Sequence, residues 1–207
     1  LTNMSVAILN YGMGNTFSIK HAIKSLGFDA YIANNPSEIE KAEKIILPGV
    51  GSFAKAMDNL NTRGWTPEIT KLVKERKIPI LGICLGMHLF ANSSNEIKKT
   101  KGLSFINGDV VKLNEIGCQN KLPHVGWNEV KLKKDLILND IDQNSDFYFV
   151  HSYCYKNLKD DVIIGTTNYG VEIISIIKYN NVIGTQFHPE KSSLVGKKIL
   201  KNFLEIS

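Results

Sequence analysis

The feature that most constrains the fold is an apolar run in which two glycines surround a cysteine. Residues 80–87 are Ile-Leu-Gly-Ile-Cys-Leu-Gly-Met, so Gly82 and Gly86 lie two positions either side of Cys84. A buried strand that turns sharply into a helix needs small residues there, because a Cβ would collide with the strained backbone. A helix that begins near Leu85 points its N–H groups at the sulfur and favours the thiolate. The pattern predicts a nucleophile elbow, against the alternative of a buried structural cysteine.

A second motif supplies a base for this nucleophile. Residues 184–192 are Gly-Thr-Gln-Phe-His-Pro-Glu-Lys-Ser and directly follow an apolar run. Proline fixes the turn, and the two-residue offset returns His188 and Glu190 to the same side. Glu190 then holds the His188 ring, and His188 takes the proton of the Cys84 thiol. A lone histidine before proline is more often a turn residue, so this prediction depends on the elbow.

Strand-like and helix-like segments alternate through the first half of the chain. Strands are expected at residues 5–10, 28–33, 45–47 and 79–84, and helices at 17–26, 52–60 and 67–76, the last opened by Pro67. This alternation predicts a parallel sheet covered on both faces, with ligands at the carboxyl ends of its strands. Short β-like runs dominate residues 102–179 and predict an extension of the sheet plus a small antiparallel layer, before a closing helix at 194–204.

Bulk composition narrows the class of protein. The 207 residues suit one α/β domain, taken as 4–207, with no structural role for residues 1–3. The net charge of +5 comes from scattered lysines, which argues against nucleic-acid binding. Three cysteines without a CxxC pair indicate a reducing cytoplasm and no disulfide framework. The chain start has no leader pattern, and the longest apolar stretch is too short to span a bilayer, so neither secretion nor a membrane location is expected.

With these motifs the chain resembles a known family, the class I (triad) glutamine amidotransferases. The Cys-His-Glu triad of that family matches Cys84, His188 and Glu190. Three further segments, at 47–53, 122–128 and 148–153, resemble those of the glutaminase subunits of imidazole glycerol phosphate synthase. The resemblance runs from Val6 to Phe203. It implies a flavodoxin-like three-layer α/β sandwich, hydrolysis of L-glutamine to glutamate and ammonia, and no metal or organic cofactor.

The turn Pro-Gly-Val-Gly at 48–51 offers backbone N–H groups without bulk, as a developing oxyanion requires. We therefore expect Val50 and Gly51 in an oxyanion hole, together with the N–H of Leu85. The alternative is an ordinary strand-to-helix turn. In proteins like this one, the turn is thought to become productive only when the partner is docked.

The resemblance also implies contacts to the substrate and the partner. Ser152 and Tyr153 belong to a segment whose backbone holds the glutamine α-amino and carboxylate groups, and Glu96 matches a position that meets the ammonium.

The resemblance implies a heterodimer with a (β/α)8 cyclase subunit, which receives the ammonia. Four positions are expected to face this partner: Asn15, Trp127, Tyr148 and Lys191. For Tyr148 a core role is an equal alternative. His151 is expected to be structural or gating. The loop at 12–14 lacks the complete dinucleotide-binding pattern. The resemblance implies instead that this loop faces the partner.

One position departs from the family pattern. Gly-Met-Gln normally follows the elbow, and the Gln contacts the bound glutamine, whereas this chain has His88. His88 lies one helical turn beyond Cys84, so we expect it near the pocket, where it replaces that hydrogen bond rather than acting as the base. The departure keeps two rivals open: a paralogous glutaminase that supplies ammonia for amidation of a surface-polysaccharide sugar, and a catalytically idle regulatory subunit.

Overall fold

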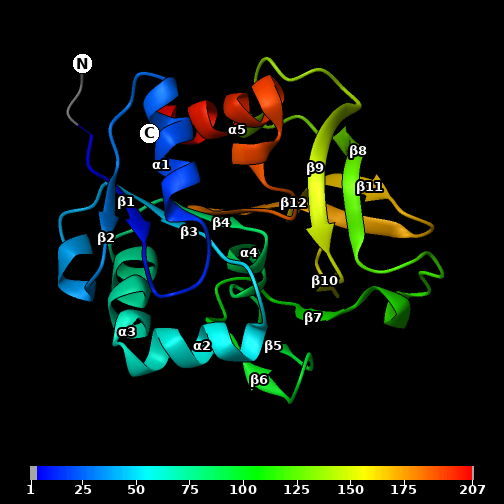
Figure 1. Cartoon of the computed structure of the whole chain (residues 1–207), viewed down its shortest axis with the longest axis horizontal. Coiled ribbons are helices and arrows are strands. Elements are labelled where there is room, and N and C mark those ends of the chain that lie inside the picture. The colour runs from blue at the N-terminus through cyan, green and yellow to red at the C-terminus, as the bar shows by residue number, and fades with distance from the viewer. Residues whose placement is uncertain (1–3, 207) are drawn as a thin grey trace.

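A long, partly parallel sheet forms the centre of the molecule (Figure 1). The computed structural model describes residues 4–206. Residue 207, the last of the expected 4–207 domain, and residues 1–3, which were given no structural role, lie outside this description. Within the described residues the sheet has nine strands in the order β2-β1-β3-β4-β13-β12-β11-β8-β9. The first five are parallel neighbours, and the rest pair antiparallel. This confirms the predicted mostly parallel half and its antiparallel extension.

The strands of the large sheet are β1 (Val6–Leu9), β2 (Tyr31–Ala33), β3 (Lys44–Leu47), β4 (Ile80–Ile83), β8 (His124–Leu132), β9 (Ser145–His151), β11 (Ile163–Asn168), β12 (Glu172–Tyr179) and β13 (Val182–Thr185). The smaller sheet contains β5 (Ser93–Ser94), β6 (Thr100–Lys101), β7 (Asp109–Lys112) and β10 (Tyr153–Lys156). The α-helices are α1 (Thr16–Ser25), α2 (Phe53–Thr62), α3 (Trp65–Thr70), α4 (Leu85–His88) and α5 (Ser193–Glu205). Single helical turns are η1 (Pro36–Ile39), η2 (Lys71–Glu75), η3 (Leu113–Ile116), η4 (Leu136–Leu138) and η5 (Pro189–Lys191).

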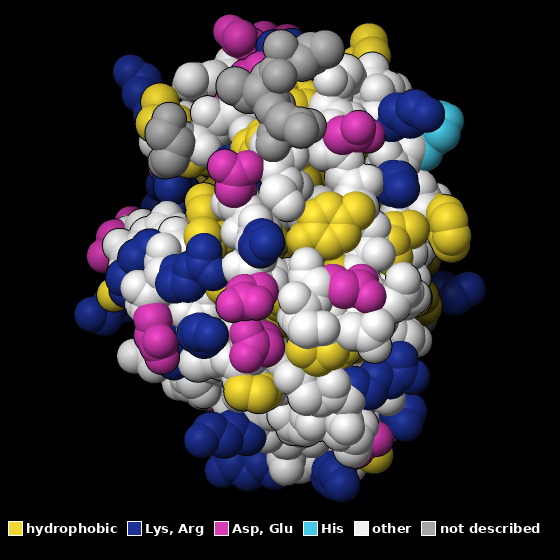
Figure 2. Space-filling view, turned by 90° about the vertical axis from the view of Figure 1, so that its left-hand side faces the viewer, with side chains coloured by type: hydrophobic (Ala, Val, Ile, Leu, Met, Phe, Trp, Pro, Cys, Tyr) yellow, Lys and Arg dark blue, Asp and Glu magenta, His cyan; other side chains and the backbone are white. Residues whose placement is uncertain are grey.

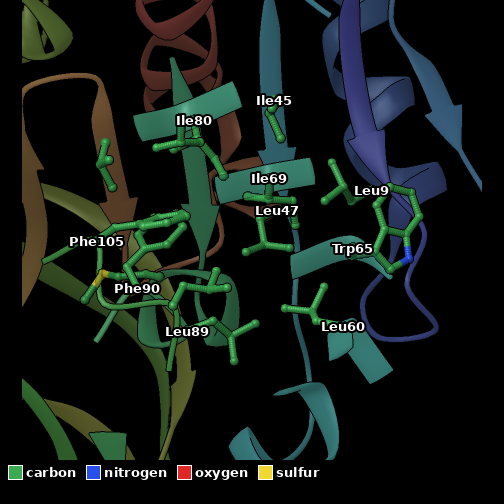
Figure 3. Close-up of a cluster of buried hydrophobic side chains, with 14 of the residues drawn as sticks. Leu9, Ile45, Leu47, Leu60, Trp65, Ile69, Ile80, Leu89, Phe90 and Phe105 are labelled. Atoms are coloured by element: carbon green, nitrogen blue, oxygen red, sulfur yellow. The ribbon is translucent and has the colours of Figure 1, made fainter. Parts of the chain in front are cut away.

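Alternation along the parallel strands builds two cores, one on each face. In β1, Val6 and Ile8 pack with α1 and α5, whereas Ala7 and Leu9 pack with α2 and α3. Successive side chains of a strand point to opposite faces, so a strand covered on both sides must be apolar throughout. Figure 3 shows the second core, where Trp65 and Ile69 of α3 face Leu9, Ile45 and other strand residues. The helices therefore cover both faces, as in the predicted three-layer sandwich (Figure 1).

Several element boundaries differ from the sequence expectations. The helix expected to open at Pro67 begins at Trp65, because Gly64 in a left-handed conformation ends the preceding turn, and it continues as the π-helical turn η2. The strand expected at 28–33 is paired only from Tyr31. The small second sheet is not purely antiparallel, since β5 and β7 run parallel. The two strand differences follow from backbone pairing, which composition does not specify.

The antiparallel half brings β9 back over the end of β4. β8 and β9 lie side by side at the right of the molecule (Figure 1). The N–H of His188 donates to the carbonyl of Tyr148 at 3.0 Å, and Ser192 Oγ accepts from the N–H of Tyr148 at 3.0 Å. These bonds fix β9 against the segment that follows β13. As a result, Val150 reaches Cys84, which is 66 residues away in the sequence.

The surface carries charges of both signs. On the face in Figure 2, lysine and arginine side chains are interspersed with acidic and apolar ones rather than gathered into one patch. Among residues 4–206, no helix is long and apolar enough to cross a membrane.

Candidate active site

Cys84 lies in a strained turn between β4 and α4. Its backbone has φ 53° and ψ −109°, a conformation that residues other than glycine rarely adopt. A Cβ on Gly82 would meet the backbone carbonyl of Gly86 at 2.7 Å, and one on Gly86 would collide with the carbonyl of Leu47. Both glycines are therefore required by close backbone approach. This is the geometry expected for a nucleophile elbow, although α4 is only one turn long.

His188 and Glu190 form a buried pair beside the elbow. Nδ1 of His188 lies 2.8 Å from Oε1 of Glu190, and each side chain is only 3% exposed. Proline at 189 starts η5, so the two side chains return to the same side as the spacing predicted. Within the described chain, Nε2 of His188 has no hydrogen-bond partner. Because Nδ1 donates to the carboxylate, Nε2 is the nitrogen available to accept a proton.

The surroundings of His188 favour its protonated form. Burial alone would lower the pKa of the imidazole, but the interactions with Cys84 and with Glu190 outweigh burial and raise that pKa to about 9. An imidazolium beside a sulfur stabilises the thiolate, which is the nucleophilic form of cysteine. The arrangement can thus transfer a proton from Cys84 to His188.

A cavity of about 190 Å³ opens onto these groups. It is smaller than the pockets that hold drug-sized ligands, which measure roughly 300–1,000 Å³, and suits a molecule of amino-acid size. Its lining includes every predicted member of the triad, oxyanion hole and substrate site except Glu190: Val50, Gly51, Cys84, Leu85, His88, Glu96, Ser152, Tyr153 and His188, together with Val150 and His151. Residues from four distant parts of the sequence therefore converge on one small space.

A hydrogen bond from a buried tyrosine fixes the glycine turn at 48–51. Tyr11 donates its hydroxyl to the Pro48 carbonyl at 2.8 Å, and burial raises the pKa of Tyr11 well above its ordinary value. Gly51 has φ +103°, and a Cβ on Gly49 would meet Leu85 Cβ at 2.8 Å. The turn consequently packs against the first residue of α4. Val50 and Gly51 lie beside Leu85 and Cys84 in the cavity wall, where oxyanion donors are needed.

Glu96 links the cavity to the helix that follows this turn. Its Oε2 accepts a hydrogen bond from the N–H of Phe53, the first residue of α2, at 2.5 Å. A carboxylate in the wall of a small cavity can pair with a ligand ammonium. Across the cavity, the Ser152 carbonyl accepts from the N–H of Leu113 at 2.9 Å, which fixes the backbone of that segment.

His151 takes part in a chain of hydrogen bonds rather than in the pair with Cys84. Its Nδ1 lies 2.8 Å from the carbonyl of Tyr153, and its Nε2 lies 3.0 Å from Nδ1 of His124. Since a carbonyl only accepts, His151 donates from Nδ1 and accepts at Nε2, and His124 donates. Burial lowers the pKa of His124 to about 4 and that of His151 to about 3, so both are neutral. This arrangement agrees with the structural role expected for His151.

His88 lines the cavity but hydrogen-bonds within the protein. Its Nε2 lies 2.7 Å from Oε1 of Gln186, and Nε2 of Gln186 lies 3.9 Å from the sulfur of Cys84. Sequence reasoning missed Gln186, Tyr11 and Val150. Gln186 directly follows β13 and Tyr11 lies two residues beyond β1, so both occupy carboxyl ends of parallel strands. The general rule that such ends carry ligand sites could have found them.

The residues expected at the partner are all accessible to some degree. Asn15 and Lys191 are exposed, Trp127 is 53% exposed and Tyr148 is half-buried. Trp127 and Tyr148 face each other across the β8–β9 pair, with ring centroids 6.1 Å apart. Asn15 also caps α1, accepting from the N–H of Ser18 at 3.1 Å. Tyr148 is therefore not a core residue in this chain, and contact with a partner stays a prediction for all four.

Among residues 4–206, no group of three or more His, Cys, Asp or Glu side chains could hold a metal ion. The free cysteines Cys118 and Cys154 are buried away from the cavity lining.

Comparisons with known proteins agree with this geometry. The family model described as glutamine amidotransferase class-I matches residues 7–206. The protein named "Imidazole glycerol phosphate synthase subunit HisH 2" from Methanococcus maripaludis is 48% identical over 97% of this chain and 98% of its own length. The corresponding HisH protein of Methanocaldococcus jannaschii is 46% identical over 97% and 99%. HisH 1 of Campylobacter jejuni is 43% identical over 97% and 100%.

Solved structures share the fold at much lower sequence identity. "Structure of PurLQS from Thermotoga maritima" superposes with a TM-score of 0.77 at 19% identity, covering 97% of each chain. A structure described as a glutamine amidotransferase has a TM-score of 0.76, also at 19% identity and covering 97% of each chain. With the family model and the close relatives in agreement over nearly the full length, the chain belongs to the class-I glutamine amidotransferases and, within them, to the HisH-like members.

Proposed function

We propose that this protein is the glutaminase subunit of imidazole glycerol phosphate synthase in histidine biosynthesis. It hydrolyses L-glutamine to glutamate and ammonia, and passes the ammonia to a HisF-like (β/α)8 cyclase subunit in a cytoplasmic heterodimer. The relatives at 41–48% identity are named as subunits of that synthase, which supports both the reaction and the need for a second subunit.

The reaction begins at Cys84. His188 takes the thiol proton through Nε2, and the sulfur attacks the side-chain amide carbon of glutamine. Glu190, bound to Nδ1 at 2.8 Å, orients the ring and stabilises its positive charge. The N–H groups of Val50 or Gly51 and of Leu85 stabilise the oxyanion that forms.

Collapse of this intermediate breaks the carbon–nitrogen bond. His188 gives its proton to the departing nitrogen, so ammonia leaves and a γ-glutamyl thioester remains on Cys84. His188 then takes a proton from water, whose oxygen attacks the thioester and releases glutamate and the thiol. Glu96 pairs with the α-ammonium group, and the backbone of Ser152 and Tyr153 holds the α-carboxylate.

One observation carries this proposal. The His188–Glu190 pair lies buried beside a cysteine at φ 53°, and Cys84 and His188 both line one small cavity, with Glu190 bound to the far nitrogen of His188. A structural cysteine needs neither a strained backbone nor a charged histidine beside it. The idle-subunit reading has no comparable support.

The test is glutaminase activity in the reconstituted complex. The isolated chain is expected to hydrolyse glutamine slowly, and addition of the cyclase subunit with its ligand is expected to raise the rate by orders of magnitude. A complex without glutaminase activity would favour the idle regulatory subunit. A fast isolated chain would contradict control by the partner.

A second candidate is a paralogous glutaminase that supplies ammonia for amidation of a surface-polysaccharide sugar. One observation favours keeping it: Methanococcus maripaludis has proteins named HisH 1 and HisH 2, and this chain matches them at 41% and 48% identity. Complementation of a histidine auxotroph that lacks its own glutaminase subunit separates the two. Growth supports the synthase, and failure to grow despite glutaminase activity supports the paralogue.

A further inference from the structure

A buried polar pair, His88 and Gln186, lies next to the sulfur of Cys84. His88 is 5% exposed and Gln186 is fully buried. Nε2 of His88 lies 2.7 Å from Oε1 of Gln186, and the amide nitrogen of Gln186 lies 3.9 Å from the Cys84 sulfur. The three side chains therefore form a series of contacts. His88 of α4 contacts Gln186, which directly follows β13, and Gln186 contacts Cys84 in the elbow.

Two groups from the protein compete for the sulfur. The thiol can donate to the carbonyl of Val150, 3.8 Å away, and that carbonyl interacts only with the protonated form. The Gln186 amide N–H is a donor, so it favours the thiolate. Its effect depends on which end of the amide faces Cys84, because the two ends are alike in shape but opposite in hydrogen bonding.

His88 determines that orientation. Burial lowers the pKa of His88 to about 4, so the ring is neutral and one of its nitrogens carries the proton. With the proton on Nε2, His88 donates to Oε1 of Gln186 and leaves the amide N–H groups toward the sulfur. The other tautomer would accept from the amide nitrogen and turn the amide oxygen toward Cys84, which would repel a thiolate.

We propose that Gln186 is a positioning donor for the Cys84 thiolate and that His88 acts through Gln186, by holding its amide with the N–H groups toward the sulfur. The inference rests on the proposed glutaminase function, since it concerns the same nucleophile. It gives His88 a role other than the substrate contact made by the Gln of the family pattern. The residue that touches the reacting sulfur is Gln186, and His88 orients it.

Alkylation of Cys84 by iodoacetamide measures the thiolate without glutamine or turnover. The reaction is followed on the Cys84 peptide by mass spectrometry, as a function of pH, in the full chain bound to its cyclase. Gln186→Met keeps the length but removes the amide, and should move the midpoint of the curve up by about one pH unit. His88→Leu should move it in the same direction by less. His88→Gln should restore the midpoint, because its amide can also donate to Gln186.

The double variant tests whether His88 acts through Gln186. Adding His88→Leu to Gln186→Met should cause no further shift, whereas independent roles would give additive shifts. In steady-state assays, kcat of Gln186→Met should fall about tenfold while KM stays within about twofold. If His88 instead contacts glutamine, His88→Leu will raise KM and leave the alkylation midpoint unchanged, which overturns the proposal.

Because Gln186 is fully buried, a second test uses only variants of His88. If Gln186→Met does not fold, the pair His88→Leu and His88→Gln decides alone, and a His88→Leu midpoint equal to wild type overturns the proposal. Failure of the glutaminase assignment is separate. It would appear as persistent glutamine use by a Cys84→Ala complex, whatever the alkylation curves show.

Discussion

The hydroxyl of Tyr11 donates to the carbonyl of Pro48 at 2.8 Å, which ties the loop after β1 to the glycine turn beside Cys84. Tyr11 is fully buried, and burial keeps its pKa far above ordinary values, so the hydroxyl remains a donor over the whole working pH range. Replacing it leaves a buried carbonyl without its partner.

Tyr11→Phe should therefore destabilise the protein by about 1–3 kcal/mol and lower kcat more than it raises KM, because the turn proposed to hold the oxyanion becomes loose. Urea unfolding and steady-state kinetics measure the two effects. Tyr31→Phe is the matched control, since Tyr31 makes the same kind of bond, to the Glu38 carbonyl at 2.8 Å, on the exposed surface. Equal kinetics for the two variants would argue against a role of Tyr11 in the turn.

The His188–Glu190 pair predicts how stability changes at alkaline pH. The folded-state pKa of His188 is about 9, above the unfolded value of 6.5. A raised pKa means that the folded state holds this proton more tightly, so the contribution is complete below about pH 6.5 and is lost as pH rises through about 9. The loss amounts to about 3 kcal/mol. Between about pH 6 and pH 10, the free energy of unfolding measured in urea should fall by this amount in the wild type. His188→Asn should lack this fall.

The same pair predicts a graded loss of activity. His188→Asn removes the base, whereas Glu190→Gln keeps a hydrogen-bond partner for Nδ1 and removes only the negative charge. We expect kcat to fall on the order of 10²-fold or more in Glu190→Gln, and further in His188→Asn. Wild-type kcat in both variants would mean that the triad assignment is wrong.

The buried neutral histidines predict an acid limit on stability. The pKa of His88 and of His124 is lowered to about 4 and that of His151 to about 3, in each case first by burial. Lowered values mean that the unfolded chain binds these protons first, so stability is present above about pH 6.5 and falls below it, by about 1.4 kcal/mol per pH unit for each histidine.

Unfolding free energies between about pH 6.5 and pH 5 test this slope. His124 stacks on Phe149 and Tyr169, so His124→Phe should fill the site and remove one histidine's share of the slope. A stability that does not vary with pH in this range would refute the assignment of neutral buried rings.

Trp127 predicts the location of the partner interface. Exposed aromatic side chains are costly in water and are frequent anchors of interfaces. Trp127→Ala should weaken binding of the cyclase subunit by about 2 kcal/mol, roughly 30-fold in Kd, without changing the stability of the free chain. Leu136→Ala is the control, because Leu136 is 65% exposed and belongs to a different surface near Lys178. Calorimetric titration that gave the same Kd for both variants and wild type would exclude this face.

Local sequence signals predicted the parts of the site that local geometry determines. The glycines around Cys84 predicted its strained turn, and the Pro between His188 and Glu190 predicted their common side. Alternation of strands and helices predicted the layered sheet. In each case the physical cause, a collision or a fixed φ angle, acts within a few residues.

The remaining parts depend on contacts between distant segments. Val150 reaches Cys84 only because β9 pairs with β8 and bonds to the backbone at His188. The direction of His88 was not predictable either, since its side chain turns to Gln186, 98 residues further along the chain. Helical spacing placed His88 near the cavity, but only the fold determines its hydrogen-bond partner.

The proposed function requires Cys84 to generate the ammonia that a second active site consumes. In the complex with the cyclase subunit, synthesis is measured with glutamine and, separately, with added ammonium salts, for wild type, Cys84→Ser and the control Cys118→Ser. Cys118 is buried, and its sulfur donates to the Tyr169 carbonyl, which a serine can also do. Cys84→Ser should abolish glutamine-dependent synthesis and leave ammonium-dependent synthesis intact, while Cys118→Ser keeps both. Continued use of glutamine by Cys84→Ser would contradict the account.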